Sequence, residues 1–222
     1  MSLKYSLKKD NDTKTYIYLN TENGKNLDDI QSLLENNDDV VIESNSETVN
    51  TINSYKNVTD YIYRIITNSR FLCKGLNPEY IKDSFHHVDA VLIIGSSMNV
   101  LPNGNIYGFA LIVFDETKNA IYIDVICSHI GIKSAGDTLI KAVESISKQL
   151  LMSKIYLTSV ESAIPFYEKY GFIKKDASCY DMCLMTKLLN KNYGGKNSKK
   201  MKIIKTRKNK NKNKKRNTKK RL

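Results

Sequence analysis

The sequence predicts an α/β domain, and three observations in its second half lead to that prediction. Residues 121–129, which read Ile-Tyr-Ile-Asp-Val-Ile-Cys-Ser-His, are β-branched and aromatic, as is typical of a strand. After a short loop, apolar residues recur at the spacing of one helix face, at Leu139, Val143, Ile146 and Leu150. Residues 154–158 have a second buried-strand pattern, so a strand, a helix and a strand follow one another along the chain.

Local signals place the ends of two helices in this half. The tetrapeptide Ser134-Ala-Gly-Asp137 fits a capping box, so we expect the first helix to begin there. Residues 163–170 predict a short second helix, and Gly171 is the residue type that commonly follows a helix C-terminus. A helix N-terminus just beyond a strand end is a ready site for an anion.

The first half of the chain and its end predict further elements. Alternating or continuous apolar runs predict strands at 14–19, 40–43, 90–95 and 106–115, and a final strand pair at 173–180 and 182–188. Helical spacing and capping residues predict helices at 26–34, 57–70 and 77–87, the last with a proline at its first position.

The run Ala163-x-x-Phe166-Tyr167-Glu168-Lys169-x-Gly171-Phe172 resembles the "A-x-x-x-Y-E-K-x-G-F" pattern of the GNAT family of acetyl-CoA-dependent N-acetyltransferases. The resemblance covers residues 55–189. It implies a central mixed, mostly antiparallel sheet with helices on both faces. We therefore divide the chain into an N-terminal extension (1–38), a GNAT-like domain (39–189) and a basic tail (190–222).

The resemblance also implies a site for acetyl-CoA as co-substrate. In the family the central strand pairs through its backbone with the pantetheine arm, and here that stretch is Ile126, Cys127 and Ser128. The pyrophosphate is then expected on the loop and helix start formed by Lys133, Ser134, Ala135 and Gly136. This loop departs from the family pattern Arg/Gln-x-x-Gly-x-Gly/Ala, because Ser134 replaces the first glycine and Asp137 follows the last. The alternative is an ordinary strand–loop–helix that binds no ligand.

Acetyl transfer to an amine needs a base for the ammonium proton and an acid for the departing thiolate. The family register assigns the acid to Tyr167, with Tyr170 as the alternative hydroxyl. Asp124 is the acid within an otherwise apolar strand, so it is our candidate base. The structural alternative is a carboxylate that faces an open sheet surface or is bonded to a neighbouring turn. His129, just past the strand, is a second candidate that would act through water.

Charge is distributed unevenly along the chain. Residues 190–222 hold 16 Lys and Arg residues and no acid, which leaves 19 basic and 23 acidic residues in the rest. Such a run cannot bury a core, so we expect it to be disordered and to contact nucleic acid without sequence specificity. Asn/Lys-rich tails of this kind resemble those on proteins of large DNA viruses.

Cysteine and histidine usage argues against metal and disulfide sites. The four cysteines (73, 127, 179 and 183) have no CxxC spacing, and the chain holds three histidines, so we expect reduced, buried cysteines and no metal. No apolar run is long enough to span a bilayer, and the first residues do not read as a signal peptide. We expect a cytoplasmic or nuclear protein, not a secreted one, and no membrane contact.

These observations lead to one functional hypothesis and one rival. The first is direct transfer of an acetyl group from acetyl-CoA to a primary amine on a small molecule or a protein, with Tyr167 as general acid. The rival is a catalytically inactive GNAT-fold binding module whose basic tail binds nucleic acid or serves as a nuclear or virion address.

Overall fold

The computed structural model describes residues 5–6, 13–20, 27–34, 41–43, 55–68, 72–73, 75–96, 105–176, 179 and 181–189. The helices are α1 (Asp28–Leu34), α2 (Tyr55–Asn68), α3 (Pro78–Ser84), α4 (Ala135–Gln149) and α5 (Ile164–Glu168), and a 3-10 turn, η3 (Glu161–Ala163), precedes α5. The strands are β1 (Tyr5–Ser6), β2 (Thr13–Leu19), β3 (Val41–Glu43), β4 (Ala90–Ser96), β5 (Asn105–Asp115), β6 (Ala120–Ser128), β7 (Ile132–Lys133), β8 (Lys154–Val160), β9 (Ile173–Lys174) and β10 (Met182–Leu188).

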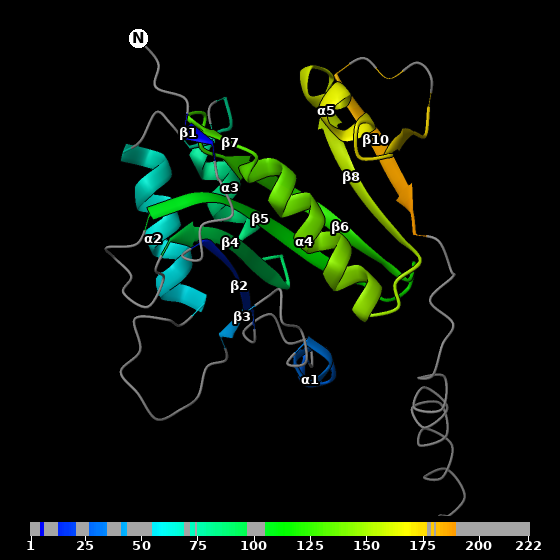
Figure 1. Cartoon of the computed structure of the whole chain (residues 1–222), viewed down its shortest axis with the longest axis horizontal. Helices are drawn as coiled ribbons and strands as arrows, with labels where there is room; N and C mark the ends of the chain where they lie inside the picture. Colours follow the sequence, from blue (N-terminus) through cyan, green and yellow to red (C-terminus); the bar gives the residue numbers. More distant parts are fainter. Residues whose placement is uncertain are drawn as a thin grey trace, which may run out of the picture. The chain divides into compact units, whose positions relative to one another are not determined.

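One large sheet organises the domain, and its strand order is β3-β2-β4-β5-β6-β8-β10-β9 (Figure 1). The pairs β2–β3 and β6–β8 are parallel, and the other neighbours are antiparallel. A separate parallel pair joins β1 to β7. The predicted mixed, mostly antiparallel sheet is therefore confirmed.

Helices cover both faces of this sheet, as predicted. The α4-side core contains apolar residues of α1, α4 and α5 packed on alternate strand positions such as Leu92, Ile112 and Ile123. The α2–α3-side core contains residues of α2 and α3 packed on the opposite positions, such as Ile93, Leu111 and Val125. The central strands β4 and β5 are apolar on both sides because both of their faces are buried.

Helix α4 connects the parallel strands β6 and β8. Its residues at helical spacing, including Leu139, Val143 and Ile146, are fully buried against the sheet. On the half-exposed side, the Glu144 carboxylate forms an ion pair with the Lys187 ammonium of β10. This crossover leaves the N-terminus of α4 near the end of β6 (Figure 1).

Strands β6 and β8 pair over only part of their lengths. Their parallel register runs from Ala120 opposite Lys154 to Ile123 opposite Leu157, and it ends there. We call the opening beyond it, between residues 124–128 of β6 and 158–160 of β8, the fork (Figure 1). Among the described residues, this end of β6 therefore has a β5 partner on one side and no β8 partner on the other.

Part of the predicted N-terminal extension (1–38) belongs to the main sheet. Strand β2, at the alternating run predicted for 14–19, pairs with β4 along its whole length, so this part of the 1–38 extension belongs to the main sheet. The strand predicted at 40–43 is β3, which lies at the edge of the sheet beside β2. Contacts between Cα atoms divide the chain into Met1–Leu189 and Asn190–Leu222. The predicted disordered tail lies outside the described residues.

The cysteines contradict the prediction of reduced thiols. Cys73 is bonded to Cys127 with their Cα atoms 4.9 Å apart, and Cys179 is bonded to Cys183 with their Cα atoms 5.2 Å apart. The first pair joins positions 54 residues apart, because a β-bridge between Leu72 and His129 places the α2–α3 connection beside the end of β6. Spacing along the sequence does not reveal such a contact. The bonded pairs remove the support that reduced cysteines gave to a cytoplasmic or nuclear location.

None of the helices in the described part of the chain is long and apolar enough to cross a membrane. No group of three or more His, Cys, Asp or Glu side chains in that part is arranged to hold a metal ion.

Candidate functional site at the β6–β8 fork

Within the described residues, the backbone groups on one side of β6 have no β8 partner beyond Ile123. The His129 amide donates to the Tyr107 carbonyl at 2.8 Å, and the same register places Cys127 opposite Phe109. Because pairing alternates along an antiparallel ladder, Cys127 directs its backbone groups toward β5. The backbone groups of Ile126 and Ser128 point the other way, into the fork. Of the three residues expected to pair with the pantetheine arm, only Ile126 and Ser128 therefore have backbone groups directed away from β5.

A β-bulge places Asp124 at the closed end of the fork. The β5–β6 register shifts between Leu111, opposite Val125, and Ile112, opposite Ile123, so Asp124 is the extra residue. Ile123 belongs to the α4-side core and Val125 to the α2–α3-side core, so the strand changes its inward face at this point. The half-buried Asp124 carboxylate consequently faces α3.

Two tyrosines hold the Asp124 carboxylate. The Tyr80 hydroxyl of α3 donates to Asp124 Oδ1 at 3.2 Å, and the Tyr122 hydroxyl interacts with both Asp124 and Thr158. Burial first, and then the Asp124 charge, raises the pKa of Tyr80. Burial is also the main cause of the raised pKa of Tyr122. Both phenols therefore stay protonated at neutral pH and act as hydrogen-bond donors.

The loop between β6 and α4 adopts a turn that normally calls for glycine. Ser134 has φ 75°, in the left-handed region, and its side chain makes no capping hydrogen bond to the helix. The predicted capping box is therefore wrong, although the helix begins where it was expected. The residue that replaces the first family glycine has the backbone conformation a glycine would adopt. Lys133 and Ser134 are exposed, whereas Ala135 is fully buried.

This strained serine leads to a prediction about stability. Replacing Ser134 by glycine removes about 1–2 kcal/mol of left-handed strain, and the greater freedom of glycine in the unfolded chain offsets part of it. We expect Ser134→Gly to raise the melting temperature by about 1–4 °C in a calorimetric scan. Ser134→Ala is the matched control, because it removes the hydroxyl and keeps the Cβ atom. An equal rise in both variants would show that the backbone is not strained.

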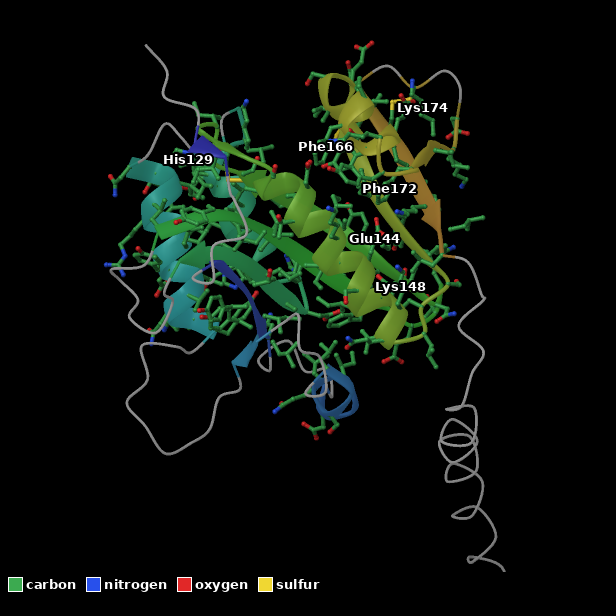
Figure 2. The ribbon with its side chains drawn as sticks, in the orientation of Figure 1. His129, Glu144, Lys148, Phe166, Phe172 and Lys174 are labelled. Carbon is green, nitrogen blue, oxygen red and sulfur yellow. A yellow bond between two sulfur atoms is a disulfide. The ribbon has the colours of Figure 1, made fainter. Side chains whose placement is uncertain are left out.

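Gly136 lies where three elements meet. A Cβ atom at this position would lie 3.1 Å from Phe166 Cζ of α5 and 3.9 Å from Ser128 Oγ of β6. Figure 2 shows Phe166 between α4 and α5. The next residue, Asp137, is paired with Lys169 of the turn after α5, at 3.5 Å. The first turn of α4 thus faces the fork, and the Asp137 charge there is balanced.

Tyr167 is held by aromatic contacts on α5. Its ring packs edge-on against Phe166 and Phe172, with centroids 5.1 and 5.8 Å away (Figure 2 labels both phenylalanines). Helix α5 ends at Glu168, earlier than the predicted residue 170, and Gly171 closes the turn that follows it, with φ +80° and its amide donating to the Glu168 carbonyl. Burial alone raises the pKa of Tyr167 to about 12. Among the described residues, no side chain or carbonyl forms a hydrogen bond with its hydroxyl.

The other two candidate proton-transfer residues, His129 and Tyr170, are placed less favourably than Asp124 and Tyr167. His129 Nδ1 accepts a hydrogen bond from the Gly131 amide at 3.0 Å, so its ring is engaged in its own turn. Tyr170 is half-buried, and its ring packs against the Phe166 ring with the centroids 5.2 Å apart. Sequence reasoning missed Tyr80, because nothing in the pattern of α3 indicates that its exposed face meets β6.

The chain is similar to several solved structures. No protein-family model and no curated protein matches the chain. Nourseothricin acetyltransferase is 13% identical, with 46% of this chain and 65% of that one covered and a TM-score of 0.36. Ard1 from Thermoplasma volcanium is 17% identical, with 62% and 94% covered and a TM-score of 0.43. A GNAT family acetyltransferase from Elizabethkingia anophelis with acetyl-CoA bound is 19% identical, with 51% and 84% covered and a TM-score of 0.40.

The chain thus spans less than two thirds of the length of nourseothricin acetyltransferase. None of these structures supports the viral origin suggested by the tail. At these identities and TM-scores, function has to be argued from the residues of the fork itself.

Proposed function

We propose that the protein is a GNAT-type N-acetyltransferase that transfers an acetyl group from acetyl-CoA to a primary amine at the fork. The observation that carries the proposal is that strand β6, the first turn of α4 and helix α5 meet at Gly136, where a Cβ atom would lie 3.9 Å from Ser128 Oγ and 3.1 Å from Phe166 Cζ. Within the described residues, β6 has no β8 partner at Ile126 and Ser128, α4 begins after the left-handed turn at Ser134, and α5 carries the buried phenol of Tyr167. The Tyr-Glu-Lys-x-Gly-Phe run at 167–172 resembles the family's pattern and supports the same conclusion.

The residues present fit acetyl-CoA as co-substrate. An extended amide chain pairs with a strand edge through backbone hydrogen bonds, which Ile126 and Ser128 offer. A pyrophosphate suits the first turn of the 15-residue helix α4, where amide groups and the helix dipole favour negative charge. The exposed Lys133 adds a positive charge. The pairing of Asp137 with Lys169 reduces the repulsion that a carboxylate would exert on phosphate.

The two candidate proton-transfer groups lie on opposite faces of the sheet. Asp124 faces α3, whereas Tyr167 belongs to the α4-side core. The fork is the opening through which groups on both faces reach the same reacting atoms. In the proposed reaction Asp124 takes a proton from the ammonium, the amine nitrogen forms a bond to the acetyl carbon, and the carbon–sulfur bond breaks. Tyr167 donates a hydrogen bond to the departing sulfur, and the second proton that the nitrogen loses passes to this sulfur, which leaves as a thiol. No covalent acetyl-enzyme is required.

The cofactor part of the proposal is tested by a substitution at Gly136. Glutamate there adds bulk against Phe166 and a negative charge beside the expected phosphates. We expect Gly136→Glu to weaken acetyl-CoA binding at least tenfold in calorimetry, about 1.4 kcal/mol. Gly136→Ala is the control, since it adds the Cβ atom without the charge, and its loss should be smaller.

A thermal shift provides the complementary measurement. A ligand that binds only the folded state stabilises it by about 2.7 kcal/mol at a concentration of 100 times its Kd. Wild-type protein with excess acetyl-CoA should therefore melt at a higher temperature. If wild-type protein shows neither heat of binding nor a shift, the acetyltransferase proposal fails, and the inactive binding module becomes the better explanation.

A further inference from the structure

Tyrosine–carboxylate pairs recur on the α2–α3 side of the sheet and on the helices that cover it. In each pair a phenol donates to a carboxylate: Tyr63 to Glu79, Tyr156 to Asp115 at 2.7 Å, and Tyr80 to Asp124 at 3.2 Å. The pairs at Asp115 and Asp124 are neighbours, because the Tyr156 ring packs on the Tyr122 ring with centroids 4.9 Å apart.

In two of these pairs the third member is a lysine of the same chain. Lys118 Nζ lies 3.0 Å from Asp115 Oδ2 and 4.8 Å from the centroid of the Tyr156 ring. Lys82 Nζ lies 3.8 Å from Glu79 Oε2 and 5.2 Å from the centroid of the Tyr63 ring. Among the described residues on this side of the sheet, a carboxylate beside a phenol ring thus binds a primary alkylammonium group twice, through charge and cation–π attraction.

The pair at Asp124 has no such lysine. Within the described ranges, no Lys, Arg or His nitrogen lies within 4 Å of the Asp124 carboxylate, and its partners are the hydroxyls of Tyr80 and Tyr122. A half-buried carboxylate without a counter-ion is unfavourable. Asp124 is also the residue at which β6 and β8 separate, so this pair is the one that faces the fork.

The geometry points to Asp124, Tyr80 and Tyr122 as the binding site for the ammonium end of an unbranched alkylamine. The chemistry is that of a lysine side chain or a polyamine end. The stacked rings of Tyr122 and Tyr156 offer an apolar wall for the methylene chain. A free amino acid bound by its α-amine would place its own carboxylate near Asp124, which like-charge repulsion disfavours. That the bound amine is then acetylated rests on the proposed function. The binding of the amine does not.

The test measures amine binding to the full chain without acetyl-CoA. The probes are spermidine and Nα-acetyl-lysine methylamide, which carries only the ε-ammonium, and glycine is the α-amine comparison. We expect both alkylamines to bind by NMR titration and glycine not to bind. Asp124→Asn should weaken the binding of both at least tenfold, and Tyr80→Phe should weaken it by about threefold to tenfold, since the hydroxyl only orients the carboxylate.

Tyr63→Phe is the matched control, because it deletes the hydroxyl from a tyrosine–carboxylate pair that already holds Lys82. It should leave the binding of the alkylamines unchanged. Equal binding by wild-type protein and Asp124→Asn would overturn the inference, as would glycine binding as tightly as the alkylamines. The ratio of kcat/KM for acetylation of spermidine and of the lysine derivative then tells a polyamine acceptor from a lysine acceptor.

The two proposals fail separately. Alkylamine binding that depends on Asp124, in a protein that does not bind acetyl-CoA, would keep the ammonium site and remove the acetyltransferase proposal. Binding of acetyl-CoA together with Asp124-independent amine binding would do the reverse.

Discussion

Replacing Tyr167 by phenylalanine is expected to lower kcat for amine acetylation tenfold or more, while acetyl-CoA affinity changes little. The substitution keeps the ring that packs on Phe166 and Phe172 and deletes only the hydroxyl. Because the packing is retained and no described residue hydrogen-bonds the hydroxyl, the melting temperature should change by no more than about 2 °C. General acids contribute about 10²–10⁴-fold, so the expected loss lies at or below the lower end of that range.

The raised pKa of Tyr167 limits what its hydroxyl can do in the proposed reaction. At about 12, it lies roughly 3.5 units above a thiol of ordinary pKa, so complete proton transfer to a thiolate is uphill by about 5 kcal/mol. Hydrogen bonding to the developing charge requires no such transfer. The phenol is protonated throughout the pH range below 11, so its contribution should not vary with pH there. A pH profile in which the effect of Tyr167→Phe disappears between pH 7 and 9 would contradict this role.

The control for this prediction is Tyr170→Phe. Tyr170 is three residues further on and also contacts the Phe166 ring, but it is not the tyrosine that matches the family register. We expect Tyr170→Phe to retain turnover within about twofold. Full turnover in Tyr167→Phe, measured with an acceptor that wild-type protein acetylates, would end the assignment of Tyr167.

Removing the Cys73–Cys127 disulfide is expected to lower the free energy of unfolding by about 4 kcal/mol. The bond closes a loop of 54 residues, and the chain-entropy model relates this length to that stabilisation. For a domain of this size the loss corresponds to a fall in melting temperature of roughly 8–16 °C. The double variant Cys73→Ser, Cys127→Ser measures it by calorimetry without a reductant.

The second disulfide provides the matched control. Cys179 and Cys183 are four residues apart, so the same model gives about 2 kcal/mol for their bond. Thiol alkylation followed by mass spectrometry, with and without prior reduction, determines which pairs are bonded. Four alkylated cysteines in unreduced protein would contradict both pairings, and a larger loss in the Cys179, Cys183 variant would contradict their ranking.

The strands and helices could be predicted from the sequence where one chemical pattern dominates. β5 and β6 have long β-branched and aromatic runs, α4 has apolar residues at helical spacing, and Gly171 adopts the left-handed conformation in the turn that follows α5. Elements with weak patterns were placed less well. Ile173–Lys174 forms a strand much shorter than the predicted 173–180.

Contacts between distant parts of the chain were not predictable in the same way. The disulfide to Cys127 depends on a β-bridge between Leu72 and His129, which leaves no trace in cysteine spacing. Tyr80 reaches Asp124 because a bulge turns that carboxylate toward α3, and a single inserted residue inverts which side chains face inward. A partner for Asp124 could be predicted because a carboxylate within an apolar strand is costly without one, whereas its role as a base stays a prediction.

Hydrogen exchange at the backbone amides of Ile126, Cys127 and Ser128 is the measurement that tests the proposed cofactor site most directly. The amides of Ile126 and Ser128 point into the fork, whereas the Cys127 amide is directed to β5. Exchange followed by NMR should slow at residues 126 and 128 when acetyl-CoA is added to saturation, and it should stay constant at residue 127. Unchanged exchange at residues 126 and 128 with bound acetyl-CoA would contradict the pairing of the cofactor with this strand.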